Sequence, residues 1–303
     1  MKNSAIRRMS APLTIERLVE RLETLSIDGR GFAYQDAGGG PAVILAHCSG
    51  ASHRAWASLV GVLKDHYRVL APDLLGYGRS EPWPVNARLH PWSDLGAVLG
   101  LAELADGPVH LVGHSYGGAV ALEAARVLGT RVRSLTLIEP VAFHLLRLTG
   151  RMAEWREITS VGQQVTAALR RRQDKGAAWL YMRYWSGRLR WWTMSPRARR
   201  GLVESVGKVG AEFEVLSQLS STIGDYQCIN MPTRLIAGER SPAPARAIVD
   251  ELEHILPNAH QCVLRRAGHM SPLTHPSEVT ALVSAHIVGA EAMQERRGQR
   301  SIA

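Results

Sequence analysis

The feature that most constrains the fold is a series of short, continuously apolar segments that alternate with segments of helical periodicity. The apolar segments are YRVLAPD (67–73), PVHLVG (108–113), RSLTLIE (133–139), TRLIAG (233–238) and HQCVLRRAG (260–268). The helical segments cover residues 54–64, 93–105, 116–129, 243–256 and 276–289. Strands that are apolar along their whole length are covered on both faces, as in parallel sheets between two layers of helices. The sequence therefore predicts an α/β fold with a mostly parallel central sheet flanked by helices.

The rest of the chain divides around this alternation. Three β-rich runs, TLSI, GFAYQD and PAVILA, predict strands before the first helix. Apolar residues at helical spacing predict an amphipathic N-terminal helix over residues 14–25, and the polar tail QERRGQRSIA predicts a frayed end. We therefore expect an N-terminal helical extension (1–23), the first part of the core (24–140), a helical cap (141–230), the second part of the core (231–290) and a frayed tail (291–303).

The expected cap carries the basic character of the chain. The net charge is +9, and between residues 151 and 200 twelve Lys or Arg residues stand against three acidic residues. Five of the eight Trp residues lie between residues 141 and 230, where no strand is evident. Such a surface attracts anionic substrates, nucleic acid or acidic lipid headgroups, or is simply a solvated helical face. The Trp side chains either line a substrate pocket or pack between cap and core.

Cysteine content and apolar runs restrict the compartment and the partners. Cys48, Cys228 and Cys262 form no CxxC or Cys/His pattern, which predicts free thiols and no metal site. The apolar runs are far shorter than the roughly 20 residues of a membrane helix, and no signal-peptide core is present. We expect a cytoplasmic protein with no integral membrane segment, no cofactor and no nucleic-acid partner. Its partner would be a small-molecule substrate, anionic if the cap arginines bind it, and a homodimer through the N-terminal helix remains open.

A tight turn around Ser115 is the strongest chemical signal in the chain. The residues GHSYG, from Gly113 to Gly117, lie between an apolar strand and an Ala-rich helix. A serine at such a strand-to-helix turn has a strained backbone, and small neighbours are needed where strand and helix nearly touch. The helix N-terminus also favours negative charge that develops beside the serine. We therefore expect Ser115 to be a nucleophile.

With this turn, the chain resembles the α/β-hydrolase family. APDLLGYGRS (71–80), LAHCSGASHRAW (45–56) and RAGHMSPLTHP (266–276) are similar to further motifs of that family, in the family's order. The resemblance covers residues 24–140 and 230–289, and it implies the α/β-hydrolase fold but leaves the cap unmatched. The cap, inferred from the break in the alternation, would be inserted after the sixth strand, which ends at Glu139.

The resemblance also implies the roles of several residues. His269 would be the general base, with His275 as its competitor. The backbone N–H groups of Ser49 and Tyr116 would form the oxyanion hole. His47 would brace the oxyanion loop. Cys48 stands where the family usually has glycine, and as a rival nucleophile it lacks the turn around Ser115.

The acid of a catalytic triad is missing from its usual place. The resemblance puts that place at Ser241, which carries no charge. Glu239 lies closer to the end of the preceding strand than the usual acid does. Some members of the family carry the acid one strand earlier, and here that position is Glu139. We favour Glu139 over Glu239 and over a remote acid such as Asp225, with a salt bridge to a cap arginine as the alternative role of Glu139.

These residues predict a serine hydrolase that cleaves a carboxylic ester, a lactone or a thioester through an acyl-enzyme intermediate. A carbon–carbon bond hydrolase of dioxo acids remains open, since a basic cap could hold a substrate carboxylate. A non-hydrolytic binding protein that keeps the fold is the contrasting class.

Overall fold

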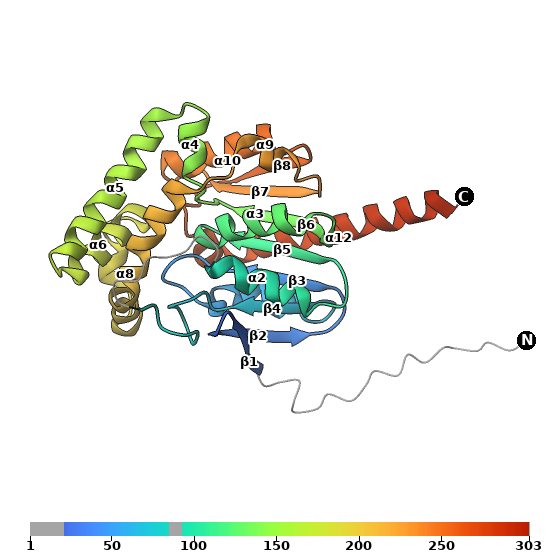
Figure 1. Cartoon of the computed structure of the whole chain (residues 1–303), viewed down its shortest axis with the longest axis horizontal. Coiled ribbons are helices and arrows are strands. Elements are labelled where there is room, and N and C mark those ends of the chain that lie inside the picture. The colour runs from blue at the N-terminus through green and yellow to red at the C-terminus, as the bar shows by residue number, and fades with distance from the viewer. Residues whose placement is uncertain (1–20, 85–92, 303) are drawn as a thin grey trace, which may run out of the picture.

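The computed structural model describes residues 21–84 and 93–302, which form a single eight-stranded sheet between layers of helices (Figure 1). The strand order is β1-β2-β4-β3-β5-β6-β7-β8. β2 is antiparallel to both β1 and β4, and the remaining neighbours are parallel. The strands are β1 (Arg21–Ile27), β2 (Arg30–Gly38), β3 (Ala42–Ala46), β4 (Arg68–Pro72), β5 (Val109–His114), β6 (Val132–Ile138), β7 (Thr233–Gly238) and β8 (Ala259–Leu264).

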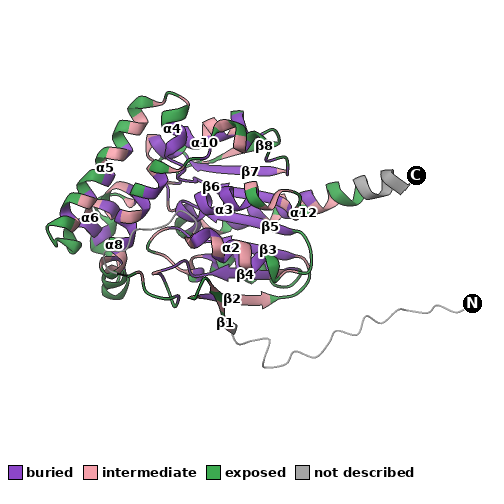
Figure 2. Ribbon diagram, in the orientation of Figure 1, coloured by how far each residue is buried: buried purple, intermediate pink, exposed green. Residues whose placement is uncertain are grey.

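Both faces of the sheet are buried, as the continuous apolar strands predict. Alternate residues of β3 point to opposite faces, so that Ile44 joins one buried cluster while Val43 and Leu45 join another. The first cluster includes residues of α2 (Ser93–Glu103), α3 (Tyr116–Leu128) and α10 (Ala243–Ile255). The second includes residues of α1 (Ala57–Leu63) and α12 (Pro276–Ile302). Figure 2 shows the central strands almost wholly buried between these helices.

A helical cap is inserted between β6 and β7, which confirms the prediction of a cap after the sixth strand. Its longer helices lie beyond one end of the sheet (Figure 1). A buried face of α8, with Val206, Val209 and Phe213, packs against α5 and α6. The cap helices are α4 (His144–Leu148), α5 (Met152–Arg170), α6 (Asp174–Ser186), α7 (Arg190–Thr193), α8 (Pro196–Gln218) and α9 (Ile223–Gln227).

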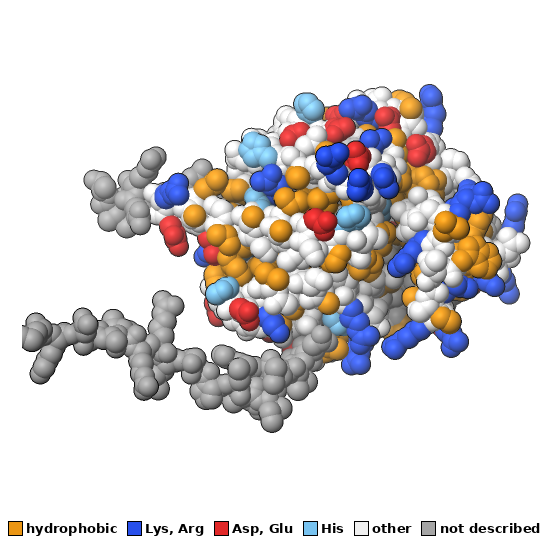
Figure 3. All heavy atoms as spheres, turned by 180° about the vertical axis from the view of Figure 1, so that it is seen from behind, with side chains coloured by type: hydrophobic (Ala, Val, Ile, Leu, Met, Phe, Trp, Pro, Cys, Tyr) orange, Lys and Arg blue, Asp and Glu red, His pale blue; other side chains and the backbone are white. Residues whose placement is uncertain are grey.

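The Trp and Arg residues of the cap do not all have the same role. Trp191 is buried within the cap and Trp192 is exposed, while Trp185 reaches the core. The guanidinium of Arg183 lies over the ring of Trp179, so part of the basic excess is paired with aromatic rings. Figure 3 shows Lys and Arg side chains gathered on the surface that the cap forms.

Two expected boundaries differ from the structure. The N-terminal helix predicted over 14–25 lies mainly outside the described residues, but residues 21–25 belong to β1, because pairing with β2 satisfies their backbone groups. At the other end, α12 continues to Ile302, past the expected end of the core at 290. Within the described chain, none of the helices has the length and apolar character needed to cross a membrane.

Candidate active site

The turn predicted around Ser115 joins β5 to α3 with a strained backbone. Ser115 has φ 55° and ψ −118°, a left-handed conformation that side chains rarely adopt. Its N–H donates to the carbonyl of Ile138 at 3.0 Å, which fixes the turn to the neighbouring strand. A Cβ atom at Gly117 would lie 2.3 Å from the carbonyl oxygen of Ala46, and one at Gly113 would lie 2.4 Å from that of Gly117. The glycines are therefore needed for the close approach of strand and helix.

Ser115, His269 and Glu139 form a continuous hydrogen-bonded chain. Nε2 of His269 lies 2.8 Å from Oγ of Ser115, and Nδ1 of His269 lies 2.6 Å from Oε2 of Glu139. All three side chains are buried. They come from the β5–α3 turn, the loop after β8 and the residue after β6, which meet at the carboxyl edge of the parallel strands. The distance from Glu139 to His269 is within the roughly 3 Å expected of a base and the acid that orients it.

The carboxylate of Glu139 is held on both sides. The N–H of Gly238 donates to its Oε1 at 2.5 Å, while Oε2 faces His269. The backbone of Glu139 has φ 43°, and its N–H donates to the carbonyl of Ile236 in β7. This strained residue is therefore bonded at its backbone and at both carboxylate oxygens, and its partner is His269 rather than a cap arginine.

The other candidate acids are engaged elsewhere. Glu239 is exposed and accepts a hydrogen bond from the backbone N–H of Arg266. Asp225 caps the start of α9 through Thr222. Ser241 is buried, and its Oγ has no hydrogen-bond partner among residues 21–84 and 93–302. Of the carboxylates considered from the sequence, Glu139 is the one that lies against His269.

Two aromatic side chains enclose His269. The rings of Trp185 and His269 are 4.0 Å apart, so the cap contacts the imidazole directly. Nε2 of His114 lies 2.8 Å from the carbonyl oxygen of His269, and burial lowers the pKa of His114 to about 3. His275, the competitor considered from the sequence, instead contacts the hydroxyl of Thr274. His269 is therefore held by a ring contact with the cap and by a hydrogen bond between its carbonyl oxygen and His114.

The loop after β3 accommodates Cys48, in place of the glycine usual in the family, without a left-handed backbone at that residue. The left-handed residue of this loop is Gly50, with φ 69°, and Cys48 is not among the residues with positive φ. Burial raises the pKa of the Cys48 thiol to about 12, which keeps it protonated and unreactive at neutral pH. His47 bridges two loops, with Nδ1 2.7 Å from the carbonyl oxygen of Cys48 and Nε2 accepting from the N–H of Leu74.

The neutral state of His47 makes the stability of the fold sensitive to acid. Burial lowers the pKa of His47 to about 4, whereas an unfolded histidine titrates near 6.5. Between these values the unfolded chain binds the additional proton, so the free energy of unfolding falls as the pH is lowered from 6.5 to 4. A histidine that is neutral in the folded protein and protonated in the unfolded chain changes the free energy of unfolding by about 1.4 kcal/mol per pH unit where the dependence is steepest. In His47→Gln, the slope of the unfolding free energy against pH should decrease by the equivalent of about one bound proton. Urea unfolding at pH 4.5, 5.5 and 6.5 measures this slope.

The exposed His66 provides the control for this measurement. The His66→Gln variant should keep the slope of the wild-type protein. An unchanged slope in His47→Gln would show that His47 is not held neutral in the folded state.

A buried group of charged side chains connects the cap to the core, and the sequence analysis missed it. Nζ of Lys208, in α8, lies 2.9 Å from Asp94 Oδ2 and 3.4 Å from Glu212 Oε1. The hydroxyl of Tyr116 donates to Asp94, and that of Tyr77 donates to Glu212. One sequence signal was available for this group. Lys208 and Glu212 are an i, i+4 pair in α8, and they lie beside the apolar pair Val209 and Phe213. The partner Asp94 comes from a distant helix, which the local sequence does not indicate.

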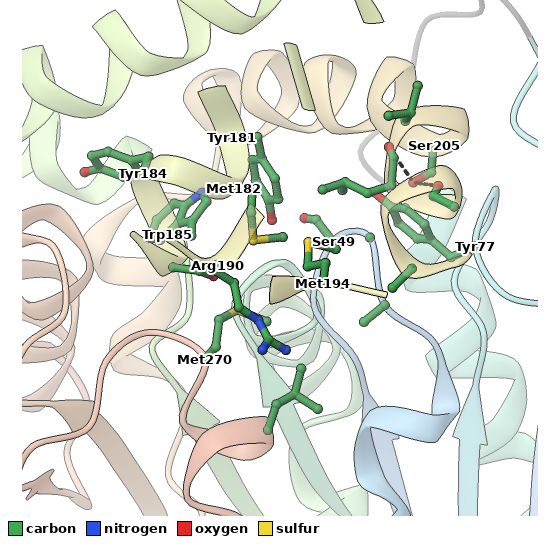
Figure 4. A pocket seen from close by; sticks show the side chains of 18 of the residues that line it. Ser49, Tyr77, Tyr181, Met182, Tyr184, Trp185, Arg190, Met194, Ser205 and Met270 are labelled. Carbon is green, nitrogen blue, oxygen red and sulfur yellow. Dashed lines mark hydrogen bonds between the residues drawn. The ribbon is translucent and has the colours of Figure 1, made fainter. Parts of the chain in front are cut away.

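A large cleft lies between the cap and the carboxyl edge of the sheet. Its volume is about 2050 Å³, and His269, Trp185 and the loop at Ser49 line it. Figure 4 shows Met182 and Arg190 of the cap extending into this cavity, with the hydroxyl end of Tyr181 directed toward Ser49. The cleft gives a substrate access to His269. Across residues 21–84 and 93–302, no group of three His, Cys, Asp or Glu residues is arranged to hold a metal ion.

The fold and this site place the chain in a known class of proteins. Residues 43–282 match the alpha/beta hydrolase family, and the chain belongs to it. The enol-lactonase from Burkholderia xenovorans has a similar structure, with a TM-score of 0.70 and 20% identity over 88% of this chain and 100% of that one. The carboxylesterase CesB from Bacillus subtilis is also similar, with a TM-score of 0.67 and 17% identity over 89% of this chain and 92% of that one.

Curated relatives match over a shorter length. The 2-hydroxy-6-oxo-2,4-heptadienoate hydrolase of Pseudomonas putida is 36% identical over 125 residues, which are 40% of this chain and 45% of that protein. The pimeloyl-[acyl-carrier protein] methyl ester esterase of Methylococcus capsulatus is 41% identical over 108 residues, which are 36% of this chain and 40% of that protein. These matches span less than half of the length of either relative.

Proposed function

We propose that the protein is a serine hydrolase that cleaves a carboxylic ester, a lactone or a thioester of a small molecule through an acyl-enzyme intermediate. The observation that carries this proposal is the hydrogen-bonded chain from Ser115 through His269 to Glu139. A serine hydroxyl is a weak nucleophile until a base within hydrogen-bond distance removes its proton. The names of the structural neighbours, an enol-lactonase and a carboxylesterase, agree with acyl transfer to water.

Each residue of the site has a step in this mechanism. Oγ of Ser115 attacks the carbonyl carbon while Nε2 of His269 takes the hydroxyl proton. The negative charge moves to the carbonyl oxygen, where the N–H groups of Ser49 and Tyr116 are the proposed donors. The protonated His269 then gives its proton to the leaving alcohol or thiol, and water repeats the sequence to release the acid. Glu139 holds the imidazole in the required tautomer and stabilises its positive charge.

Hydrolysis of a carbon–carbon bond is the second candidate. It is favoured by the similarity to the Pseudomonas putida hydrolase and by Arg190, whose guanidinium extends into the cleft and could bind a substrate carboxylate. The two candidates share Ser115 and His269, and they differ in the bond that breaks. A dioxo acid assayed beside simple esters separates them.

The proposal is tested with p-nitrophenyl acetate and with a fluorophosphonate probe. We expect a burst of p-nitrophenol equal to the concentration of active sites, followed by steady turnover. The probe should label one site, and labelling should block the burst. Lack of both turnover and labelling would contradict the proposal and favour a binding protein that keeps the fold.

A further inference from the structure

A small pocket beside Ser115 shares Ser49, Tyr181 and Trp185 with the main cleft, and its other lining residues are its own. Its volume is about 10 Å³, which is room for about one water-sized group. Ser115 belongs to the wall of this pocket, whereas His269 belongs to the wall of the main cleft. The remaining lining residues are Ser49, Val141, Phe143, Tyr181, Trp185, Val209, Glu212, Phe213 and Leu216.

The two spaces match the two halves of an ester. The leaving group must receive its proton from His269, so it has to lie on the side of the main cleft. The acyl group, bound to Ser115, then extends toward the small pocket. That pocket has room for the terminal group of a short acyl chain, and a longer chain would not fit.

Glu212 introduces a carboxylate into this otherwise mostly apolar wall. The residue is 2% exposed, and its Oε1 accepts a hydrogen bond from the hydroxyl of Tyr77 at 2.9 Å. The other oxygen, Oε2, makes no hydrogen bond of normal geometry with any residue in the described part of the chain. A hydrogen bond from the hydroxyl of Ser49 lowers the pKa of Glu212, although its geometry at Oε2 is poor. A buried carboxylate oxygen whose donor is poorly aligned keeps unused accepting capacity, so a well-placed donor on a bound substrate would be held strongly.

The charges around Glu212 favour a donor over an anion. Burial raises the pKa of Glu212 to about 7, and Lys208 opposes this rise. A pH of 8 lies above this value and favours the carboxylate form. Lys208 is shared with Asp94, so one buried cation faces two carboxylates. No surplus positive charge remains in this group for a substrate carboxylate. A neutral hydroxyl can donate to Oε2 at a lower desolvation cost than an ammonium group.

We propose that the small pocket is an acyl-group site in which Glu212 selects a short acyl chain that carries a hydroxyl group. This inference rests on the proposed function and adds the class of acyl group that the same site prefers. The hydroxyl donates to Oε2 of Glu212, and the apolar residues around it contact the carbon chain. The volume of the pocket favours a hydroxyl on the first or second carbon beyond the ester carbonyl.

Two pairs of esters of equal shape test this site: ethyl glycolate with ethyl propionate, and ethyl 3-hydroxypropionate with ethyl butyrate. In each pair a hydroxyl group replaces a methyl group. We measure kcat/KM at pH 8 in a pH-stat and take the ratio of hydroxy ester to alkyl ester. The ratio in the wild-type protein divided by the ratio in Glu212→Leu cancels the intrinsic reactivity of the esters. For at least one pair this quotient should be about 10 or more, because the site loses its acceptor while the alkyl ester keeps its contacts.

Glu214→Leu is the matched control, because Glu214 is exposed on the same helix. This variant should keep the wild-type ratio. Glu212→Gln keeps the shape and an acceptor oxygen, so its ratio should lie between those of the wild type and Glu212→Leu, and it decides the question if Glu212→Leu does not fold. Equal ratios in all variants, with normal hydrolysis of the alkyl esters, would overturn the acyl site and leave the proposed function intact. Failure of the wild-type protein on every ester, p-nitrophenyl acetate included, would instead remove the proposed function itself.

Discussion

Ser115→Ala should lower kcat for p-nitrophenyl butyrate by about 10⁵-fold, with the residual rate coming from binding and the oxyanion donors. The change removes Oγ, which lies 2.8 Å from Nε2 of His269 and is the proposed nucleophile. Alanine keeps the Cβ atom, so the strain at φ 55° is unaltered and the fold should be retained. The variant should also lose all labelling by the fluorophosphonate probe. Burst kinetics and circular dichroism, measured on the same preparation, separate loss of chemistry from loss of fold.

Ser241→Ala is the matched control for this loss. Oγ of Ser241 is also buried, but it has no hydrogen-bond partner in residues 21–84 and 93–302. Its removal should leave kcat within about threefold of the wild-type value, as for changes that do not touch the reacting atoms. Turnover that survives in Ser115→Ala would assign the nucleophile to another residue, and Cys48→Ala would then test the remaining candidate near the oxyanion loop.

The sheet and the triad candidates could be predicted because short stretches of sequence determine both of them. Strands buried on both faces must be apolar throughout, and the turn at Ser115 needs Gly113 and Gly117 for steric reasons that the structure makes visible. Glu139 could be singled out because the family resemblance allows an acid one strand before the usual place, and because a lone carboxylate at the end of an apolar strand requires a partner. The contact with His269, which is 130 residues away in the chain, is the partner that the fold supplies.

The group around Lys208 could not be predicted in the same way. Lys208 and Glu212 form an i, i+4 pair, but such pairs are also common on solvated helix surfaces, so the pair alone does not indicate burial. Their burial arises only when α8 packs on the core and brings them to Asp94. The end of the N-terminal segment was also assigned incorrectly, because Leu22 and Leu25 fit a helical period while the pairing of β1 with β2 determines the outcome.

Glu139→Gln should lower kcat by about 10⁴-fold, because an amide imposes the wrong tautomer on the catalytic imidazole. The N–H of Gly238 donates to Oε1 of Glu139, so a glutamine here must place its carbonyl oxygen toward Gly238. Its NH₂ group then faces Nδ1 of His269, which has to accept a hydrogen bond instead of donating one. The proton of the neutral imidazole moves to Nε2, and His269 can no longer take the proton of Ser115. The loss should therefore appear in kcat with little change in KM.

Glu239→Gln is the matched control for Glu139→Gln. Glu239 is exposed and accepts from the backbone N–H of Arg266, a bond that the amide oxygen of glutamine can keep. Its kcat should stay within about threefold of the wild-type value, since no reacting atom loses a partner. The opposite ranking of the two variants would place the acid at Glu239, directly after β7. Because both variants exchange the same carboxylate for the same amide, a difference of several orders of magnitude between them has to come from position, and the position that differs is contact with Nδ1 of His269.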